Sequence, residues 1–184
     1  MGSDTADDHR ATMLQALELA KKSPPRPSNF RVGAILVRLD GGDGHGGGGD
    51  RGRDSGGGPG VAAQGYTLEW PGNTHAEECC LLKLAEQHST TEEGLAAVMS
   101  SPHALYTTME PCSRRLSGKL PCVERLLRQR SWIRKVFVGV QEPQTFVGSN
   151  PGRRLLEEGG IQVHHVPGLE QEILAVATAG HVSH

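Results

Sequence analysis

The sequence predicts an α/β fold with three layers, α/β/α, built around a mixed five-stranded sheet. Amphipathic helical segments alternate with short β-prone segments along the chain, in the order αββαβαβαβα. Such alternation is typical of folds in which helices cover a central sheet. The length of 184 residues suits one hydrophobic core of ordinary size. We therefore expect residues 1–184 to form a single domain.

The N-terminal part of the chain is predicted to form a helix followed by a strand. Residues 8–22 are predicted to be helical because their apolar side chains recur on one face at helical spacing. The run 23–27 contains three prolines and ends this helix, since proline cannot continue it. Residues 30–38 are predicted to be a strand that is apolar on both faces after Gly33, as in the centre of a sheet.

A glycine-rich insert follows at residues 41–60, where twelve of the 20 positions are glycine. Such a segment buries too little apolar surface to offset the entropy of ordering it. We interpret it as a flexible loop that joins the strand 30–38 to a partner strand at 61–68 in a hairpin. His45 and the aspartates beside it leave a metal-binding role of this insert open as an alternative.

The rest of the chain alternates helices and strands. Residues 75–86 are predicted to be a helix, and Cys79 and Cys80 fall in its apolar stretch, so we expect them in the core. Residues 135–140 are predicted to be a strand because four of the six are Val or Phe, which favour β-structure. The other predicted elements are a strand at 104–108, a helix at 122–130, a helix at 152–158, a strand at 161–166 and a helix at 169–177.

Composition excludes several classes of function. The net charge of −2 and the aromatic content of 4% give no support to nucleic-acid binding. Apolar stretches are too short to span a bilayer, and the N-terminus lacks the apolar run of a secretion signal, so we expect a cytoplasmic protein without a membrane partner. A disulfide framework is then improbable, and metal binding is the better interpretation of some of the four cysteines.

Three short motifs predict a catalytic zinc site: His75-Ala76-Glu77, Pro111-Cys112 and Pro121-Cys122. One histidine and two cysteines supply three ligands that Zn²⁺ prefers, and they leave its fourth tetrahedral position open. Zinc in such a site makes hydroxide available at neutral pH. Glu77, two residues after the histidine, can move the proton of that water without binding the metal. This arrangement is typical of zinc deaminases.

The predicted elements support this interpretation. His75 and Cys122 each lie where a helix is expected to begin, and helix N-termini stabilise negative charge, here the thiolate of Cys122 and the carboxylate of Glu77. The alternative is that His75 is a surface histidine, Glu77 an ordinary acid of a first helical turn, and both cysteines small core residues. Each motif alone occurs by chance, but the three together, in this order, favour the zinc site.

The segment from Thr108 to Cys122 closely resembles the deaminase of riboflavin biosynthesis in its fungal form, a member of the cytidine and deoxycytidylate deaminase superfamily. Asn29 with the following Val32-Gly33, and the stretch from Gly139 to Val163, resemble further parts of that family. Nine residues separate Cys112 from Cys122, whereas the common deaminase motif has two, so the intervening residues must loop out over the site. The segment Gln141–Gln144 departs from the Asp-Pro-Asn-Pro of bacterial members.

The resemblance implies a substrate, a diaminopyrimidinone that carries a 5′-phosphorylated sugar chain. The ribitylamino compound is favoured because the loop looks fungal. The phosphate needs cationic or backbone donors, and among Arg114, Arg115, Lys119, Arg153 and Arg154 we favour Lys119. The expected substrate contacts are Asn29, Ala76, Arg115, Ser117 and Lys119. The resemblance also implies Zn²⁺ as the cofactor and makes a homodimer plausible.

Other functions remain open on the sequence. The ribosylamino form of the same substrate is one alternative, and a free cytosine nucleoside or nucleotide is another, since either would use the same zinc site. A polynucleotide-editing deaminase is disfavoured by the absent basic and aromatic excess. A zinc-stabilised scaffold without catalysis would keep the ligands but would not need Glu77. Asn29 also has a structural alternative, as a turn residue after Pro27 and Ser28.

Overall fold

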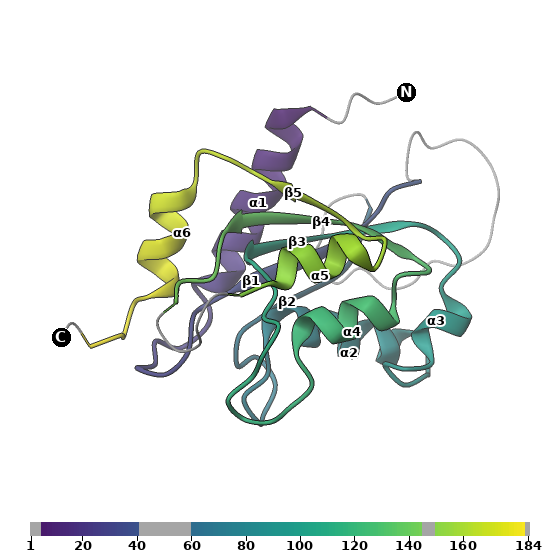
Figure 1. Cartoon of the computed structure of the whole chain (residues 1–184), viewed down its shortest axis with the longest axis horizontal. Coiled ribbons are helices and arrows are strands. Elements are labelled where there is room, and N and C mark those ends of the chain that lie inside the picture. The colour runs from purple at the N-terminus through teal and green to yellow at the C-terminus, as the bar shows by residue number, and fades with distance from the viewer. Residues whose placement is uncertain (1–4, 41–59, 145–149, 183–184) are drawn as a thin grey trace.

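The computed structural model describes residues 5–40, 60–144 and 150–182, and these form a mixed five-stranded sheet with helices on both faces (Figure 1). The strand order is β2-β1-β3-β4-β5. The strands are β1 (Gly33–Arg38), β2 (Val61–Tyr66), β3 (His103–Met109), β4 (Ile133–Val140) and β5 (Gln162–His165). The helices are α1 (Ala6–Ala20), α2 (Ala76–Gln87), α3 (Leu95–Val98), α4 (Cys122–Arg128), α5 (Gly152–Glu158) and α6 (Glu170–Ala177).

Strand directions confirm the predicted mixed sheet. β1 pairs antiparallel with both β2 and β3, whereas β3, β4 and β5 run parallel. The hairpin of β1 and β2 was predicted, and its register places Ala34 opposite Gly65. Residues 41–59 of the insert that joins these strands, with His45 among them, are outside the part of the chain that the structure describes. The single domain over residues 1–184 stays a prediction for the same reason.

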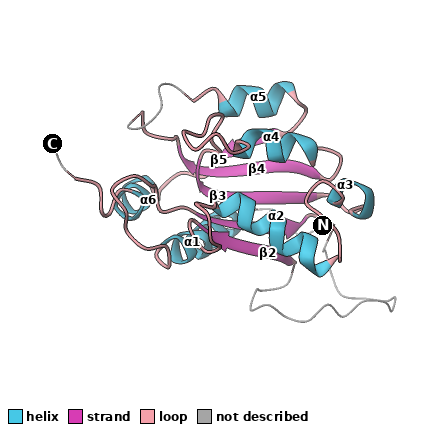
Figure 2. Ribbon diagram, turned by 90° about the horizontal axis from the view of Figure 1, so that it is seen from below, coloured by secondary structure: helices cyan, strands magenta, loops and turns pink. Residues whose placement is uncertain are grey.

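Two apolar clusters hold the layers together. On one face of the sheet, α2, α4 and α5 pack on alternate residues of β1, β3 and β4, as Figure 2 shows from the side of these helices. On the other face, α1 and α6 cover Ile35, Tyr106 and Phe137. Period-2 alternation of side chains along each strand sends successive residues to opposite clusters. Both faces of the sheet are therefore buried, which explains why β1 is mostly apolar and why every residue of β3 is buried.

Element boundaries differ from the sequence prediction by a few residues. Helix α1 begins at Ala6 because Thr5 and Asp8 form a capping box, with the Thr5 hydroxyl accepting the Asp8 N–H at 3.2 Å. Strand β1 begins only at Gly33. The short helix α3 was not predicted, since four residues are too few to show a helical period. Cys79 and Cys80 are fully buried in α2, as predicted.

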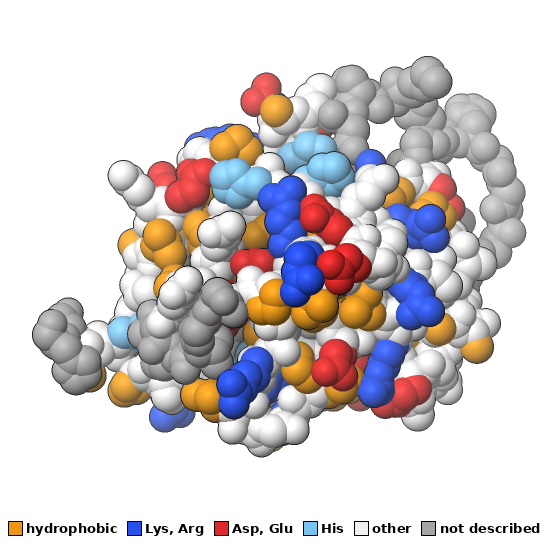
Figure 3. All heavy atoms as spheres, in the orientation of Figure 1, with side chains coloured by type: hydrophobic (Ala, Val, Ile, Leu, Met, Phe, Trp, Pro, Cys, Tyr) orange, Lys and Arg blue, Asp and Glu red, His pale blue; other side chains and the backbone are white. Residues whose placement is uncertain are grey.

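Two further observations bear on partners. On the face shown in Figure 3, basic and acidic side chains are interspersed over the described residues, in keeping with the small net charge. Among the helices of the described residues, none has the length and apolar character needed to cross a bilayer.

Candidate metal centre and active site

The ends of several elements meet at one edge of the sheet. β3 ends at Met109 and leads through Glu110 to Cys112, while α2 begins directly after His75 and α4 begins at Cys122. The carboxyl ends of parallel strands are the usual place for a site in an α/β fold. This topology brings together residues that are 37 and 47 positions apart in sequence.

His75, Cys112 and Cys122 form a cluster that could hold a metal ion. The Nδ1 atom of His75 lies 3.6 Å from the Cys112 sulfur and 3.5 Å from the Cys122 sulfur, and all three ligand atoms lie within 4.8 Å of one another. A tetrahedral zinc ion, with a Zn–N distance of about 2.1 Å and Zn–S distances of about 2.3 Å, would place its nitrogen ligand about 3.6 Å from each sulfur. The donor set and its spacing therefore fit zinc.

Helix starts and backbone hydrogen bonds fix these three side chains. His75 is the N-cap residue of α2, and its N–H donates to the Glu78 carboxylate at 3.2 Å. The N–H of Cys122, at the first position of α4, donates to the Cys112 sulfur at 3.5 Å. The N–H of Val123 donates to the Cys112 carbonyl at 3.1 Å. Both cysteines are thus held at the positive end of α4, where thiolates are stabilised.

The two cysteine thiols influence each other strongly. A hydrogen bond from Cys122 and the nearby His75 lower the pKa of Cys112 to about 4, even though burial opposes this shift. The same hydrogen bond, together with burial, raises the pKa of Cys122. Cys112 therefore favours the thiolate, and Cys122 keeps a proton at the point that both sulfurs face. A divalent cation at that point would replace this proton, because thiolates are the form that binds zinc.

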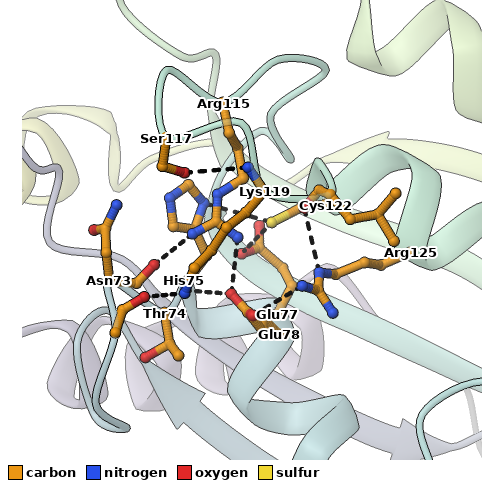
Figure 4. Close-up of polar contacts among 12 residues, drawn as sticks. Asn73, Thr74, His75, Glu77, Glu78, Arg115, Ser117, Lys119, Cys122 and Arg125 are labelled. Carbon is orange, nitrogen blue, oxygen red and sulfur yellow. Dashed lines mark hydrogen bonds and ion pairs between the residues drawn. The ribbon is translucent and has the colours of Figure 1, made fainter.

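Glu77 lies beside this cluster and is 4% exposed (Figure 4). Its Oε2 atom is 3.4 Å from the Cys122 sulfur, and its Oε1 atom is 3.3 Å from the hydroxyl of Thr107 in β3. Burial raises the pKa of Glu77. A raised pKa makes a carboxyl group a better proton acceptor, which suits the proton-transfer role that the sequence predicts for Glu77.

The cluster opens into a pocket lined by the segment before β1, the end of β3 and the loop between the two cysteines. His75, Glu77 and Cys112 are among the residues that line it. Two buried polar atoms of its lining residues, Nε of Arg115 and Oε2 of Glu142, have no hydrogen-bond partner among the described residues. Burial and the nearby Cys112 raise the pKa of Glu142 to about 7. Unpaired buried polar atoms are costly, so these two are candidates for contact with a ligand.

The expected substrate contacts are distributed unevenly around this pocket. Asn29, Arg115 and Ser117 line it, and the Asn29 amide donates to the side chain of Asn73 at 2.7 Å. Ala76 is fully buried in α2, and Lys119 donates to the Gly72 carbonyl. Neither Ala76 nor Lys119 is among the described residues that line the pocket.

The other cationic candidates also differ in position. Arg114 lines the pocket. Arg153 and Arg154 instead pair along α5 with Glu157 at 3.0 Å and Glu158 at 3.2 Å. These two arginines are not among the described lining residues of the pocket, so Arg114 is better placed for a ligand than either of them.

Sequence reasoning missed Glu142 and Glu78 as site residues. Glu142 lies in the stretch from Gly139 to Val163 that resembles the family, but the segment Gln141–Gln144 was noted as a departure from the bacterial pattern and no role was assigned to Glu142. Burial alone would raise the pKa of Glu78, but hydrogen bonding by Arg115 and the charge of Arg125 lower it overall. Glu78 is the third residue of α2 after the N-cap His75, and a Glu at this position is a sequence signal for a hydrogen bond to the backbone of the cap residue. Nothing in the sequence indicated that Glu78 would pair with Arg115 and Arg125.

Residues 6–140 match the family described as "Cytidine and deoxycytidylate deaminase zinc-binding region". The chain is 36% identical over 175 residues to the "Diaminohydroxyphosphoribosylamino-pyrimidine deaminase" of Schizosaccharomyces pombe, covering 95% of this chain and 36% of that protein. It is 36% identical over 84 residues to the "Riboflavin biosynthesis protein RibD" of Bacillus amyloliquefaciens, covering 45% of this chain and 21% of that protein. The chain thus spans about a third or less of the length of these curated relatives.

A solved structure gives a likeness over nearly the full length of both chains. The Aspergillus oryzae Rib2 deaminase in complex with DARIPP is 44% identical, with a TM-score of 0.77 and coverage of 94% of this chain and 91% of that chain. The matched zinc-binding region spans the positions of His75, Glu77, Cys112 and Cys122, and the match identifies zinc as the cofactor. The match over residues 6–140 shows that the chain belongs to the cytidine and deoxycytidylate deaminase family.

Proposed function

We propose that this protein removes an amino group, by hydrolysis, from a diaminopyrimidinone that carries a 5′-phosphorylated sugar chain, as a step of riboflavin biosynthesis. The observation that carries this proposal is a buried glutamate beside a three-ligand cluster that faces an open pocket. The likeness to a riboflavin-pathway deaminase at 36% identity over 95% of this chain supports the choice of substrate class. The 44% likeness to the Rib2 deaminase solved with DARIPP supports it further.

We propose that His75, Cys112 and Cys122 hold the zinc ion. When bound, zinc supplies a Lewis acid that makes water nucleophilic near neutral pH. Water adds to the ring carbon that carries the exocyclic amine, while Glu77 takes one water proton and delivers it to the adjacent ring nitrogen. Glu77 then takes the proton of the added hydroxyl and delivers it to the amine, which departs as ammonia and leaves a carbonyl on the ring. The raised pKa of Glu77 suits both halves of this transfer.

Pocket residues are proposed to bind and orient the substrate. Glu142 offers an unpaired carboxylate oxygen to N–H donors of the pyrimidine ring, and Arg115 offers an unpaired N–H to an acceptor. Asn29 reaches the sugar chain or the ring edge from the segment before β1. Arg114 is the cation best placed for the phosphate, with Lys119 at the far side of the same loop. Ser117 and the backbone at Ala76 remain proposed contacts.

Incubation of the zinc-loaded protein with the ribitylamino and the ribosylamino pyrimidine phosphates, with ammonia release as the readout, tests this function. We expect turnover of the ribitylamino compound, with the ribosylamino compound as the slower substrate. Cytidine and deoxycytidylate in parallel reactions test the rival specificity within the same family. Ammonia release from a cytosine compound alone would overturn the proposed substrate class, and no release from any of the four would favour a zinc scaffold.

We propose that the enzyme works in the cytoplasm, because biosynthetic enzymes make and consume its substrate class. We also propose a homodimer, because deaminases of this fold commonly pair. Light scattering of the zinc-loaded protein measures the dimer directly. A mass of one chain, 19.6 kDa, at working concentrations would contradict it.

A further inference from the structure

The long loop between the two cysteines, residues 113–121, is here named the metal-site loop. A buried group of four charged side chains joins it to α2. The four residues of this group are Glu78, Glu92, Arg115 and Arg125, with side-chain exposures of 7%, 8%, 1% and 11%. Two acids face two bases, so the group is neutral as a whole. Burying these charges removes most of their hydration, which costs free energy. Well-packed apolar residues often stabilise a fold as well as a buried ion pair or better, so a contribution to stability is a poor explanation for this group.

The Glu78 carboxylate is the centre of this group (Figure 4). Its Oε2 atom accepts hydrogen bonds from the backbone N–H of His75 at 3.2 Å and from Nη1 of Arg115 at 2.8 Å. Its Oε1 atom accepts one from Nη2 of Arg125 at 2.8 Å. One carboxylate thus ties together the cap of α2, the metal-site loop and helix α4.

Arg125 extends this connection to the other end of the metal-site loop and to a rigid support. Its Nε donates to the Leu120 carbonyl at 3.3 Å, and its Nη1 pairs with Glu92. The Glu92 backbone carbonyl accepts from the Gln129 side chain at 2.8 Å, and Gln129 in turn accepts from the fully buried Trp132 at 2.8 Å. The loop is therefore anchored through Arg125 to packed parts of the core.

Arg115 is held at both terminal nitrogens, by Glu78 and by the Asn73 carbonyl. Its Nε atom is buried, has no partner among the described residues, and belongs to a residue that lines the pocket. A guanidinium that is fixed at both terminal nitrogens can present its Nε–H in one direction only. This orientation exists before any ligand arrives, which lowers the entropy lost on binding.

We propose that Glu78 is a positioning residue, which holds Arg115 and the metal-site loop against the His75 end of α2 and so preforms one wall of the substrate pocket. The part of this proposal that concerns substrate binding rests on the proposed function. The part that concerns the loop does not, because it can be measured without substrate.

The test compares zinc-loaded Glu78→Gln with zinc-loaded wild type and with Glu69→Gln. The control also removes a partly buried carboxylate that pairs with α2, at Lys83, but it does not contact the metal-site loop. In Glu78→Gln we expect the KM for the ribitylamino substrate to rise about tenfold, the change that corresponds to one lost charge-assisted hydrogen bond. Since Glu77 and the metal ligands are untouched, kcat should change by less than about threefold, well short of the loss that removing a general acid–base group causes.

Limited proteolysis gives a second readout. Trypsin can cut the metal-site loop after Arg114, Arg115 or Lys119, and mass spectrometry separates these cuts from cuts elsewhere. The whole of Arg115, backbone included, is only 7% exposed, so we expect slow cutting after Arg115 in wild type and in Glu69→Gln. Cutting at this bond should be about tenfold faster in Glu78→Gln, the opening expected from loss of one charge-assisted hydrogen bond. Glu78→Asp keeps the charge but has a shorter reach, and it should show an intermediate KM and cutting rate. It replaces Glu78→Gln as the decisive variant if that protein does not fold.

The outcomes separate the two proposals. Equal KM and equal cutting rates in Glu78→Gln and Glu69→Gln would overturn the role of Glu78 while leaving the deaminase function intact. Faster cutting of the loop in Glu78→Gln, in a protein whose wild type releases no ammonia, would support the role of Glu78 in placing the loop and overturn the proposed function. A kcat loss as large as that of Glu77→Gln, with KM unchanged, would also overturn the positioning role, because it would place Glu78 in the chemistry itself.

Discussion

Glu77 is the side chain whose replacement separates chemistry from metal binding. Glu77→Gln keeps the shape of the side chain and can still accept a hydrogen bond, but it cannot carry a proton. We expect kcat to fall by roughly 10²–10⁴-fold, the range that general acid–base groups contribute. Elemental analysis should find zinc retained, and exposed Glu157→Gln on α5 should behave as wild type. Loss of zinc together with activity would show that Glu77 is needed to hold the metal.

We expect the Glu142 side chain to lower the stability of the fold while it strengthens substrate binding. Burial raises its pKa from 4.5 to about 7, so the folded state favours the protonated carboxyl and loses stability as pH rises through this interval. Glu142→Gln removes that ionisation. We expect its melting temperature to exceed that of wild type by a margin that grows between pH 5 and pH 8, while its KM for the ribitylamino substrate rises. A margin independent of pH would contradict the raised pKa.

Individual residues differed in how visible they were to sequence reasoning. His75, Glu77, Cys112 and Cys122 stood out in the sequence because zinc chemistry restricts both residue type and motif, and in the structure their side chains lie together. Arg115 was recognised as a loop cation, but its buried partners were not, because ion pairs between distant segments leave no local pattern. A buried atom without a hydrogen-bond partner, such as Oε2 of Glu142, can be identified only once the surrounding structure is known.

Helix α2 depends on close contact with strand β2. A Cβ atom at Gly65 would lie 2.7 Å from the Cys79 Cβ and 2.8 Å from the Ala76 carbonyl oxygen, so alanine there would push α2 away from the sheet. Because α2 carries His75 at its cap, we expect Gly65→Ala to destabilise the fold by about 1–3 kcal/mol and to weaken zinc binding. Thermal unfolding and competition with a chelator measure the two effects. Normal zinc affinity in a destabilised Gly65→Ala protein would show that His75 keeps its position when α2 is displaced.

Elements with a clear period or a clear terminator were predictable, and short or context-dependent ones were not. The first helix and the buried strands β1 and β4 follow from apolar spacing and β-branched composition. Helix α3 has four residues, which is shorter than the window any periodicity needs. The early start of α1 reflects the Thr5 cap, a local hydrogen bond that outweighed the apolar pattern used to place it.

Zinc should stabilise the entire fold as well as enable chemistry, since its proposed ligands come from the start of α2, the end of β3 and the start of α4. A ligand that binds only the folded state adds stability that grows with its concentration relative to its dissociation constant, about 4 kcal/mol at a thousandfold excess. We expect chelation to lower the melting temperature by several degrees and to abolish ammonia release, and added zinc to restore both. Cys112→Ser weakens the site, so its melting temperature should respond little to chelator. Cys80→Ala alters a buried core residue of α2, so its melting temperature should respond as fully as that of wild type, from a lower starting point. An equal response of both variants to chelator would mean that the metal sits elsewhere than between His75, Cys112 and Cys122.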